Sequence, residues 1–210
     1  MKYCDFSVHS NRSSDQKGAS LIVVLLILVI ASILGVSAIQ ISMMAEKSAR
    51  NDRDYQIAWQ ASEAALVDAE FDIEGMPASS TNKRNSIFAI GKTDLSKFIQ
   101  NCGNSSTSIG LCELNLSGKP AWLTVDFTDT SNSASAAVFG TYTGRVFPAG
   151  GAGTQPAKAP RYVIEAILDP GSSPRTRNPS ENPKYIYRVT AMGFGPNPQT
   201  QAVVQMLYRN

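Results

Sequence analysis

The stretch that decides the fold is QKGASLIVVLLILVI, residues 16–30. A lysine and a glycine stand directly before an uncharged segment, in which residues 21–30 are an unbroken run of Leu, Ile and Val, and no residue in 18–45 carries a charge. A helix of about 20 apolar residues spans the hydrocarbon core of a bilayer. The segment therefore predicts a membrane-spanning helix. A cleaved secretory signal fits the same composition, because Val36-Ser37-Ala38 has the small-x-small form of a cleavage site.

The sequence after Ala38 favours the membrane helix, because it does not change to loop composition. Residues 46–74 contain no Gly or Pro, and Gly75 and Pro77 then supply a stop signal. We expect one helix from Ala19 to Glu74, with an amphipathic second half. A stripe at helical spacing is expected to face the chain's own domain: Trp59, Ser62, Leu66, Ala69 and Ile73. A plain membrane anchor with a stalk is the simpler alternative.

The rest of the composition argues against catalysis and nucleic-acid binding. The net charge is +2 with acids and bases scattered, so nucleic acid is an unlikely partner. The single histidine, His9, precedes the apolar run, which leaves the globular part without the usual general base and metal ligand. We expect no enzyme, no catalytic residues, no cofactor and no metal site.

The cysteines predict one structural bond. Cys4 lies before the apolar run, which leaves Cys102 and Cys112 as an even pair with short spacing. In a domain that leaves the cytoplasm such a pair favours a local disulfide, which stabilises its loop by about 2–3 kcal/mol. Two unpaired buried thiols are the alternative.

The region after Pro77 predicts a small antiparallel sheet beneath exposed loops. Residues 86–90 and 95–99 suit brief helices or turns, 121–127 alternate as a half-buried strand does, and 138–147 form a weaker strand candidate. Three clearer strands are expected at 162–168, 185–192 and 202–208, with the last two joined as a hairpin through a Gly- and Pro-rich loop. The linkers 148–160 and 170–183 should be exposed loops. The expected fold class is α+β, a long N-terminal helix packed on a small antiparallel sheet.

Three further patterns carry little chemical information. Asp126, Asp129 and Asn132 lack the alternating spacing and glycine of a calcium loop. A glycine cluster at residues 150–153 has no lysine or helix directly after it, so a flexible loop is expected there instead of a phosphate site. Five basic residues are expected to be solvated surface: Arg145, Lys158, Arg161, Arg175 and Arg177.

Lys17-Gly18 before this helix resembles the type III signal of type IV pilins and type II secretion pseudopilins. The resemblance implies that an inner-membrane prepilin peptidase cuts between Gly18 and Ala19 and that Ala19 is then N-methylated. Residues 1–18 would be the removed cytoplasmic leader, consistent with their basic residues. Residues 19–45 would be the transmembrane and assembly half of the helix, 46–76 its amphipathic half, and 77–210 a periplasmic, later extracellular, head.

One position departs from the pattern of this family. Most pilins have Glu at the fifth mature position, which here is Val23. A carboxylate in hydrocarbon is costly, and the family's Glu is taken to pair with the N-terminal amine of a neighbouring subunit. A subunit at the tip has no neighbour beyond it, so losing the carboxylate suits that place. Val23 therefore predicts a minor, tip-located pilin.

Residues 51–66, NDRDYQIAWQASEAAL, resemble the N-terminal region of PilX-type minor pilins, and residues 187–193 with 202–208 resemble that family's final hairpin. The resemblance implies a subunit that primes type IV pilus assembly at or near the tip, with roles in adhesion and twitching motility. Its implied partners are other minor pilins, the major pilin, the prepilin peptidase, the inner-membrane assembly platform, a tip adhesin, and membrane lipid before assembly. The alternatives are a GspK-like minor pseudopilin of type II secretion and a soluble exported binding protein cut after Ala38.

Overall fold

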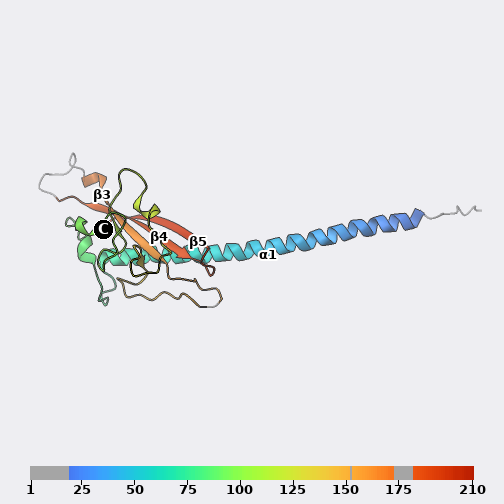
Figure 1. Cartoon of the computed structure of the whole chain (residues 1–210), viewed down its shortest axis with the longest axis horizontal. Helices are drawn as coiled ribbons and strands as arrows, with labels where there is room; N and C mark the ends of the chain where they lie inside the picture. The colour runs from blue at the N-terminus through green and yellow to red at the C-terminus, as the bar shows by residue number, and fades with distance from the viewer. Residues whose placement is uncertain (1–18, 152, 173–181) are drawn as a thin grey trace, which may run out of the picture. The chain divides into compact units, whose positions relative to one another are not determined.

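A computed structural model of the chain describes residues 19–151, 153–172 and 182–210 (Figure 1). Its contacts divide the chain into two parts, Met1–Ala49 and Arg50–Asn210, and each is described by itself. Helix α1, Ala19–Glu74, has the predicted bounds and runs through both parts. Cys4, His9, Lys17 and Gly18 lie outside the described residues, as do Arg175 and Arg177.

Helix α1 ends where the sequence indicates. Gly75 takes a φ of +76°, a left-handed conformation that suits glycine, and the N–H of Met76 donates to the carbonyl of Phe71 at 2.8 Å. These two features close the last turn of the helix. The stop is therefore local and is set by Gly75, before Pro77.

The head is built on a five-stranded sheet in the order β1-β3-β4-β5, with β2 also paired to β3. The strands are β1 Leu111–Cys112, β2 Ala137–Val138, β3 Arg161–Leu168, β4 Tyr185–Phe194 and β5 Gln201–Tyr208. The three long strands pair antiparallel, which confirms the predicted strands and the final hairpin. The sheet as a whole is mixed, because the short β1 runs parallel to β3. No sequence pattern indicates this parallel pair, which has only two residues on the β1 side.

Helix α1 covers one face of the sheet with small residues. The helix side of this interface consists of Ala58, Ala61, Ala65, Ala69 and Ile73, all at most 2% exposed. Their sheet partners include Tyr162, Ile164, Val189 and Ala191 in one apolar core. A Cβ added to Gly193 of β4 would collide with the backbone of Ala58 and Ser62, so helix and strand approach each other closely here.

Two residues of the predicted buried stripe lie elsewhere. Ser62, Ala69 and Ile73 are buried as expected, but Trp59 is 41% exposed and Leu66 is only partly buried at the edge of the core. The close approach of the sheet explains the difference, because side chains as large as Trp do not fit beneath it. Alanines at 58, 61 and 65 take their place.

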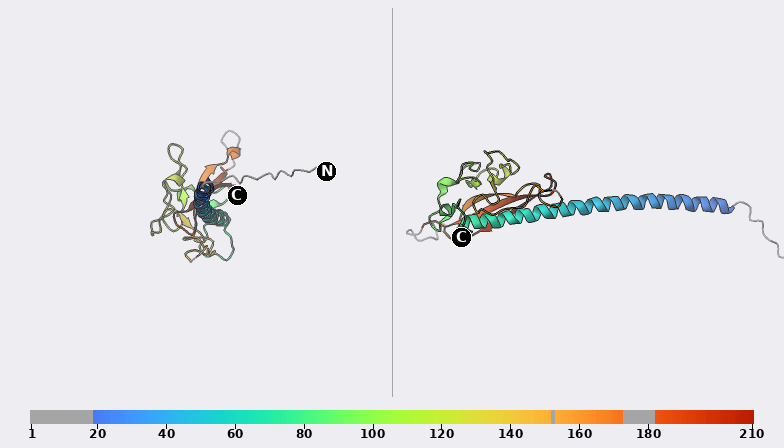
Figure 2. Two further views of the ribbon diagram at one scale, coloured as in Figure 1. Left: turned by 90° about the vertical axis from the view of Figure 1, so that its right-hand side faces the viewer. Right: turned by 90° about the horizontal axis from the view of Figure 1, so that it is seen from below.

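The other face of the sheet is covered over β3 but not over β5. Cys102, Cys112, Phe127 and Val163 belong to a second apolar cluster on this face. The yellow segment of the chain lies on the side of the sheet away from α1 (Figure 2). On β5 the side chains of Val203 and Leu207 remain exposed.

One predicted strand is wrong, and a second is much shorter than expected. Residues 121–123 form the 3₁₀ helix η3, Ala121–Leu123, and the N–H and hydroxyl of Thr124 both donate to the carbonyl of Ala121, at 2.9 and 2.7 Å. Asp126 then accepts the N–H of Thr128 and closes a further turn. Side-chain hydrogen bonds of this kind compete with a sheet ladder, and alternation alone does not report them.

The candidate strand at 138–147 is reduced to β2, because the chain turns at Gly140 and Gly144, where φ is +82° and +67°. The brief helices expected near 86–90 and 95–99 are η1, Asn85–Phe88, and η2, Leu95–Lys97. A third short helix, η4, spans Pro170–Ser172. The described parts of both predicted linkers contain no β-strand.

Candidate functional site

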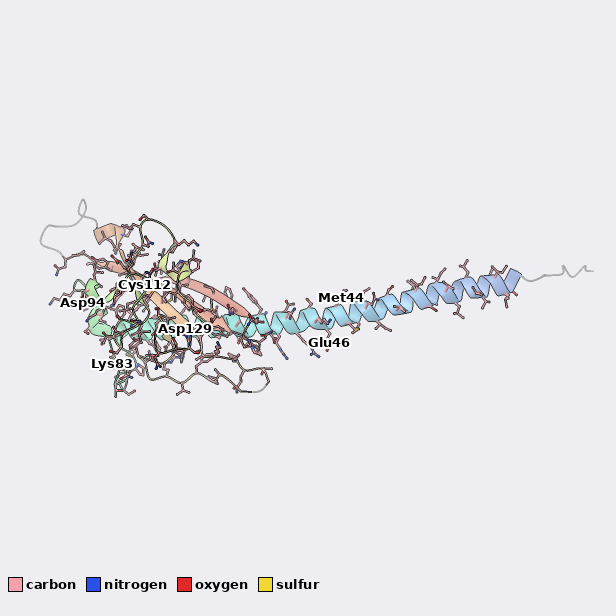
Figure 3. All side chains as sticks on the ribbon, viewed as in Figure 1. Met44, Glu46, Lys83, Asp94, Cys112 and Asp129 are labelled. Carbon is pink, nitrogen blue, oxygen red and sulfur yellow. A yellow bond between two sulfur atoms is a disulfide. The ribbon has the colours of Figure 1, made fainter. Side chains whose placement is uncertain are left out.

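The first candidate site is the N-terminal stretch of α1, where every described side chain is exposed. Residues 20–49 are all solvent-accessible, and the best 18-residue window of the helix has a mean hydropathy of 3.1. Apolar side chains surround the helix up to Met44, and the first charged residue is Glu46 (Figure 3). A helix that is apolar all round needs lipid or other protein around it.

The backbone and hydroxyl groups of this stretch are suited to an apolar environment. Ser32 and Ser37 donate their hydroxyls to the carbonyls of Leu28 and Ile33, each at 2.8 Å, so these polar groups are satisfied within the helix. Gly35 has open space around its Cα. Small residues of this kind allow close helix packing in lipid.

The predicted processing positions fall at the start of this helix. Ala19 is its first residue, and nothing is described of the Ala19 side chain or of Lys17 and Gly18. Val23 lies in the exposed stretch with 55% of its side chain accessible. The helix thus presents an uncharged surface at the position where the pilin pattern has Glu.

The predicted disulfide is present in the head. Cys102 and Cys112 are bonded across a separation of ten residues, and both are buried, at 7% and 0% exposure. The bond holds the loop that ends in β1 against β3, because Cys112 pairs with Glu165 in the parallel ladder. Asn101 and Cys102 both have a positive φ, 59° and 65°, so the loop turns sharply just before the bond. The disulfide therefore anchors the short strand that the sequence did not predict.

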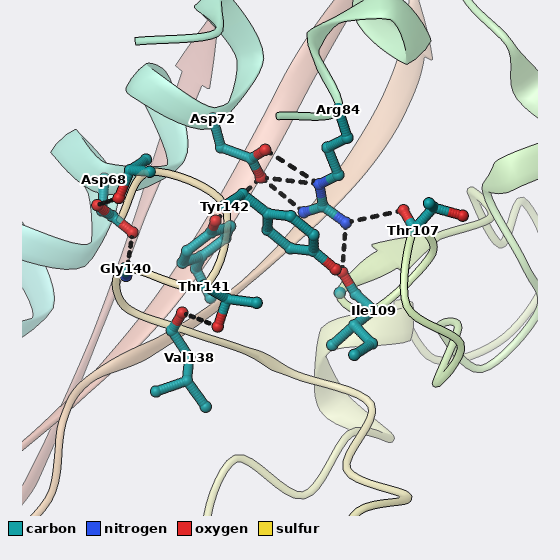
Figure 4. A network of polar contacts seen from close by, with 12 residues as sticks. Asp68, Asp72, Arg84, Thr107, Ile109, Val138, Gly140, Thr141 and Tyr142 are labelled. Carbon is teal, nitrogen blue, oxygen red and sulfur yellow. Dashed lines mark hydrogen bonds and ion pairs between the residues drawn. The ribbon is translucent and has the colours of Figure 1, made fainter. Parts of the chain in front are cut away.

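The second candidate site is a buried ionic network that fixes the end of α1 to the head (Figure 4). Asp72 is paired with Arg84, whose Nε and Nη2 donate to the carboxylate at 3.0 and 2.6 Å, and both side chains are at most 1% exposed. Tyr162 of β3 donates its hydroxyl to Asp72 at 2.9 Å. The guanidinium also lies over the ring of Tyr142, 3.5 Å from its centroid.

Arg84 also reaches the loop before β1. Its Nη1 donates to the carbonyls of Ile109 and Thr107, at 2.6 and 3.2 Å. Burial alone would lower the pKa of Arg84, but the neighbouring Asp72 carboxylate outweighs it and the pKa is raised. The guanidinium therefore stays charged and ties α1 to the loop before β1, while Tyr162 of β3 is held by the same Asp72 carboxylate.

Asp68, one turn earlier in α1, organises a second contact of the same kind. Its carboxylate accepts the hydroxyl of Thr143 at 2.6 Å and the N–H of Gly140 at 2.7 Å, and Arg145 lies 3.6 Å away. Arg145 also stacks over Phe139, 5.0 Å from its ring centroid. Asp68 and Asp72 thus pin the segment after β2 and the segment after α1 to one helix face.

Sequence reasoning missed this network. The signal that could have found it is the pair Asp68 and Asp72, separated by four residues on the helix face that also carries Ala65 and Ala69. Acids on an otherwise apolar face require partners. The sequence does not indicate which arginine supplies the partner, because Arg84 lies in a loop without regular periodicity.

The weaker motifs have local structural roles in the described residues. Asp126 and Asp129 accept hydrogen bonds from Thr128 and Ser131, which lowers the pKa of each carboxyl. Gly150 and Gly153 have positive φ values in a loop. Arg161 corrects the expectation of solvated surface: it is 6% exposed, and burial lowers its pKa although Asp129 and Asp126 oppose the shift.

The exposed apolar helix followed by a sheet-backed head defines the class of protein. A long N-terminal helix whose second half covers a small sheet is the architecture of type IV pilin-like subunits. The family comparison agrees at both ends of the chain: the PilX N-terminal region matches residues 17–67, and "Type IV pilus assembly protein PilX C-term" matches residues 99–210. The chain belongs to the PilX family.

The protein is therefore a type IV pilus minor pilin, a structural subunit that interacts with other pilus components. Its N-terminal apolar helix fits a single-pass membrane anchor. The two family matches favour this assignment over the pseudopilin and the exported binding protein. No curated protein and no solved structure matches the chain.

Proposed function

We propose that this minor pilin primes assembly of a type IV pilus and is built into the filament at or near its tip. Family membership identifies the filament as a type IV pilus, and the uncharged surface of α1 around Val23 supports a position at or near its tip. The observation that carries the proposal is the absence of charge in residues 18–45, which includes the position of the usual pilin Glu.

Maturation is the first step of the proposed pathway. The prepilin peptidase cuts between Gly18 and Ala19, and Ala19 is N-methylated. Residues 19–74 form one continuous described helix, so a cut before Ala19 would leave this helix intact. Residues 1–18 are removed on the cytoplasmic side, 19–45 stay in the inner membrane, and residues 46–76 and the head occupy the periplasm.

Assembly then moves the helix from lipid to protein. The side chains of residues 20–45 are covered by no other described part of the chain, so lipid covers them before assembly and helices of other pilins cover them afterwards. The assembly platform performs this transfer. The head, held rigid by the Asp72–Arg84 pair and the disulfide, presents its surface to neighbouring minor pilins, the major pilin and a tip adhesin.

Val23 makes this subunit suited to the end of the filament. A buried carboxylate at this position is tolerated only when a neighbouring N-terminal amine pairs with it. Without the carboxylate, the helix needs no N-terminal amine of a further subunit to pair with a buried charge. A subunit of this kind can occupy the first position without an unpaired charge in the apolar core.

The variant Val23→Glu tests this proposal. In cells that lack the wild-type subunit, we expect fewer pili and a lower share of this subunit at filament ends, measured by counting pili and by immunogold labelling. Val23→Ile keeps the position uncharged and should behave as wild type. Val24→Glu places the same charge one residue further on and reports the general cost of a carboxylate in the membrane. Unchanged pilus number and subunit position in Val23→Glu would overturn the tip assignment.

A further inference from the structure

Strand β5 forms one edge of the sheet. It pairs with β4 through eight consecutive residues, from Phe194↔Gln201 to Tyr187↔Tyr208, and within the described residues no strand pairs with its other side. The inner face of β5 joins the core through Val204, Met206 and Tyr208. Its other face is open, with Val203 44% and Leu207 66% exposed.

The ladder geometry identifies the backbone groups on this edge. Gly195 donates its N–H to the carbonyl of Thr200 at 2.8 Å, which marks these two residues as a hydrogen-bonded pair. Bonded and non-bonded pairs alternate along an antiparallel ladder. The N–H and C=O groups that turn away from β4 therefore belong to Gln201, Val203, Gln205 and Leu207. No described loop makes a backbone hydrogen bond to these four residues.

The sequence of β5 does not protect this edge. Natural edge strands are blocked by charges, prolines, bulges or short length. QAVVQMLY, residues 201–208, contains no charge, no Pro and no Gly, and its continuous register with β4 shows no bulge. An unprotected edge of eight residues suits the addition of another strand. The lack of charge argues against nucleic acid or a lipid headgroup as the partner.

The direction of β5 argues against a second copy of this chain as its partner. Gly195, beside the start of β5, lies against the Asp54 carbonyl of α1, and Tyr208 at its end donates a hydrogen bond to Glu74. Strand β5 thus runs in the same direction as residues 54–74 of α1. Symmetric pairing of two β5 strands would be antiparallel and would place the Arg50 ends of the two heads at opposite ends. That arrangement does not suit two subunits anchored in one membrane.

We propose that the free edge of β5 binds an extended segment of another pilus component, which adds to the sheet as a further strand. The segment would be uncharged, and its apolar side chains would lie beside Val203 and Leu207. Main-chain hydrogen bonds to the four outward-facing residues supply affinity, and these two side chains supply specificity. This site is separate from the membrane half of α1 and holds wherever in the pilus the subunit lies.

Photo-crosslinking in piliated cells tests the proposal. Benzoylphenylalanine replaces Leu207 in the full-length chain, and adducts are mapped by tandem mass spectrometry. The background variant Val203→Pro removes one outward N–H that β4 does not use, whereas Val203→Thr keeps it. We expect an adduct with an extended segment of another pilus protein. Its yield should fall about tenfold or more in Val203→Pro and stay within about twofold in Val203→Thr.

The disulfide and the thermal denaturation midpoint of the head show whether each variant folds. If Val203→Pro does not fold, Val203→Lys places a charge on the edge and keeps every backbone group, and it should lower the yield severalfold. An adduct joining two copies of this chain would overturn the proposal. The proposal would also be overturned by an adduct with a helical segment or with lipid, or by the absence of any adduct at residue 207. The same adduct yield in folded edge variants would overturn it as well. If the Val23→Glu experiment overturns the tip position, the crosslinking results expected here do not change, because they do not depend on where in the pilus the subunit lies.

Discussion

Two stretches of one helix differ in what surrounds them. Residues 20–49 of α1 are exposed throughout and carry large apolar side chains, whereas residues 58–73 bury a face made mainly of alanine and two aspartates. The exposed stretch is suited to lipid and other helices, for which bulk hydrophobicity is sufficient. The buried stretch must fit one particular sheet, and close approach together with ionic pairing determines that fit. Both stretches form helix, but different physical requirements determine which side chains each can bury.

The largest effect is expected where the buried stretch depends on charge. Asp72→Ala leaves Arg84 buried without its carboxylate, which should cost about 3–5 kcal/mol of head stability. Hydrogen exchange of the β3 and β4 amides in the detergent-solubilised full chain measures this cost. Asp52→Ala, at an exposed position of α1 before the buried face, should change protection by less than about 0.5 kcal/mol. Equal protection in the two variants would show that the network does not stabilise the head.

A smaller effect separates the true packing face from the predicted stripe. Ile73→Ala should destabilise the head by about 3 kcal/mol, because Ile73 is 1% exposed in the core. Trp59→Ala should cost less than about 1 kcal/mol, since Trp59 is 41% exposed and its Nε1 donates to Glu63 on the same helix. The same exchange measurement compares them. A larger cost for Trp59→Ala than for Ile73→Ala would show that Trp59 belongs to the packing face, as the sequence predicted.

The smallest of the three effects concerns the close packing of strand β4 on helix α1. Gly193→Ala adds a Cβ against the backbone of Ala58 and Ser62, and we expect a loss of about 1–3 kcal/mol as the strand moves away. Gly35→Ala makes the same change where nothing lies within 4 Å, so head stability should not change. Thermal denaturation of both full-length variants in detergent provides the comparison. An unchanged midpoint for Gly193→Ala would contradict tight packing of β4 on α1.

Much of the fold could be predicted because its signals are local and long. The uncharged run, the absence of Gly and Pro from 46–74, and Gly75 fixed the bounds of α1. Strands β3, β4 and β5 follow from β-branched and aromatic runs, and the hairpin follows from its turn residues. The disulfide followed from counting cysteines.

The errors arose where side chains or distant segments decide the structure. Residues 121–127 alternate as a strand does, but Thr124 and Asp126 bond the local backbone and form turns instead. The parallel strand β1 depends on the Cys102–Cys112 loop meeting β3, a contact that no local pattern encodes. The partners of Asp68 and Asp72 are likewise distant in sequence. Val23 could be identified from the resemblance alone, and its role stays a prediction.

The N-terminal mass of the mature protein tests whether the chain is processed and assembled as a pilin. The chain is isolated from membranes of cells that contain prepilin peptidase, and the mass of its N-terminal peptide is measured. We expect a chain that begins at N-methylated Ala19, the first described residue of α1. A chain that begins at Met1 would indicate a plain membrane anchor, and one that begins at Ile39 would indicate a cleaved secretory signal. Either result would contradict assembly through the apolar helix.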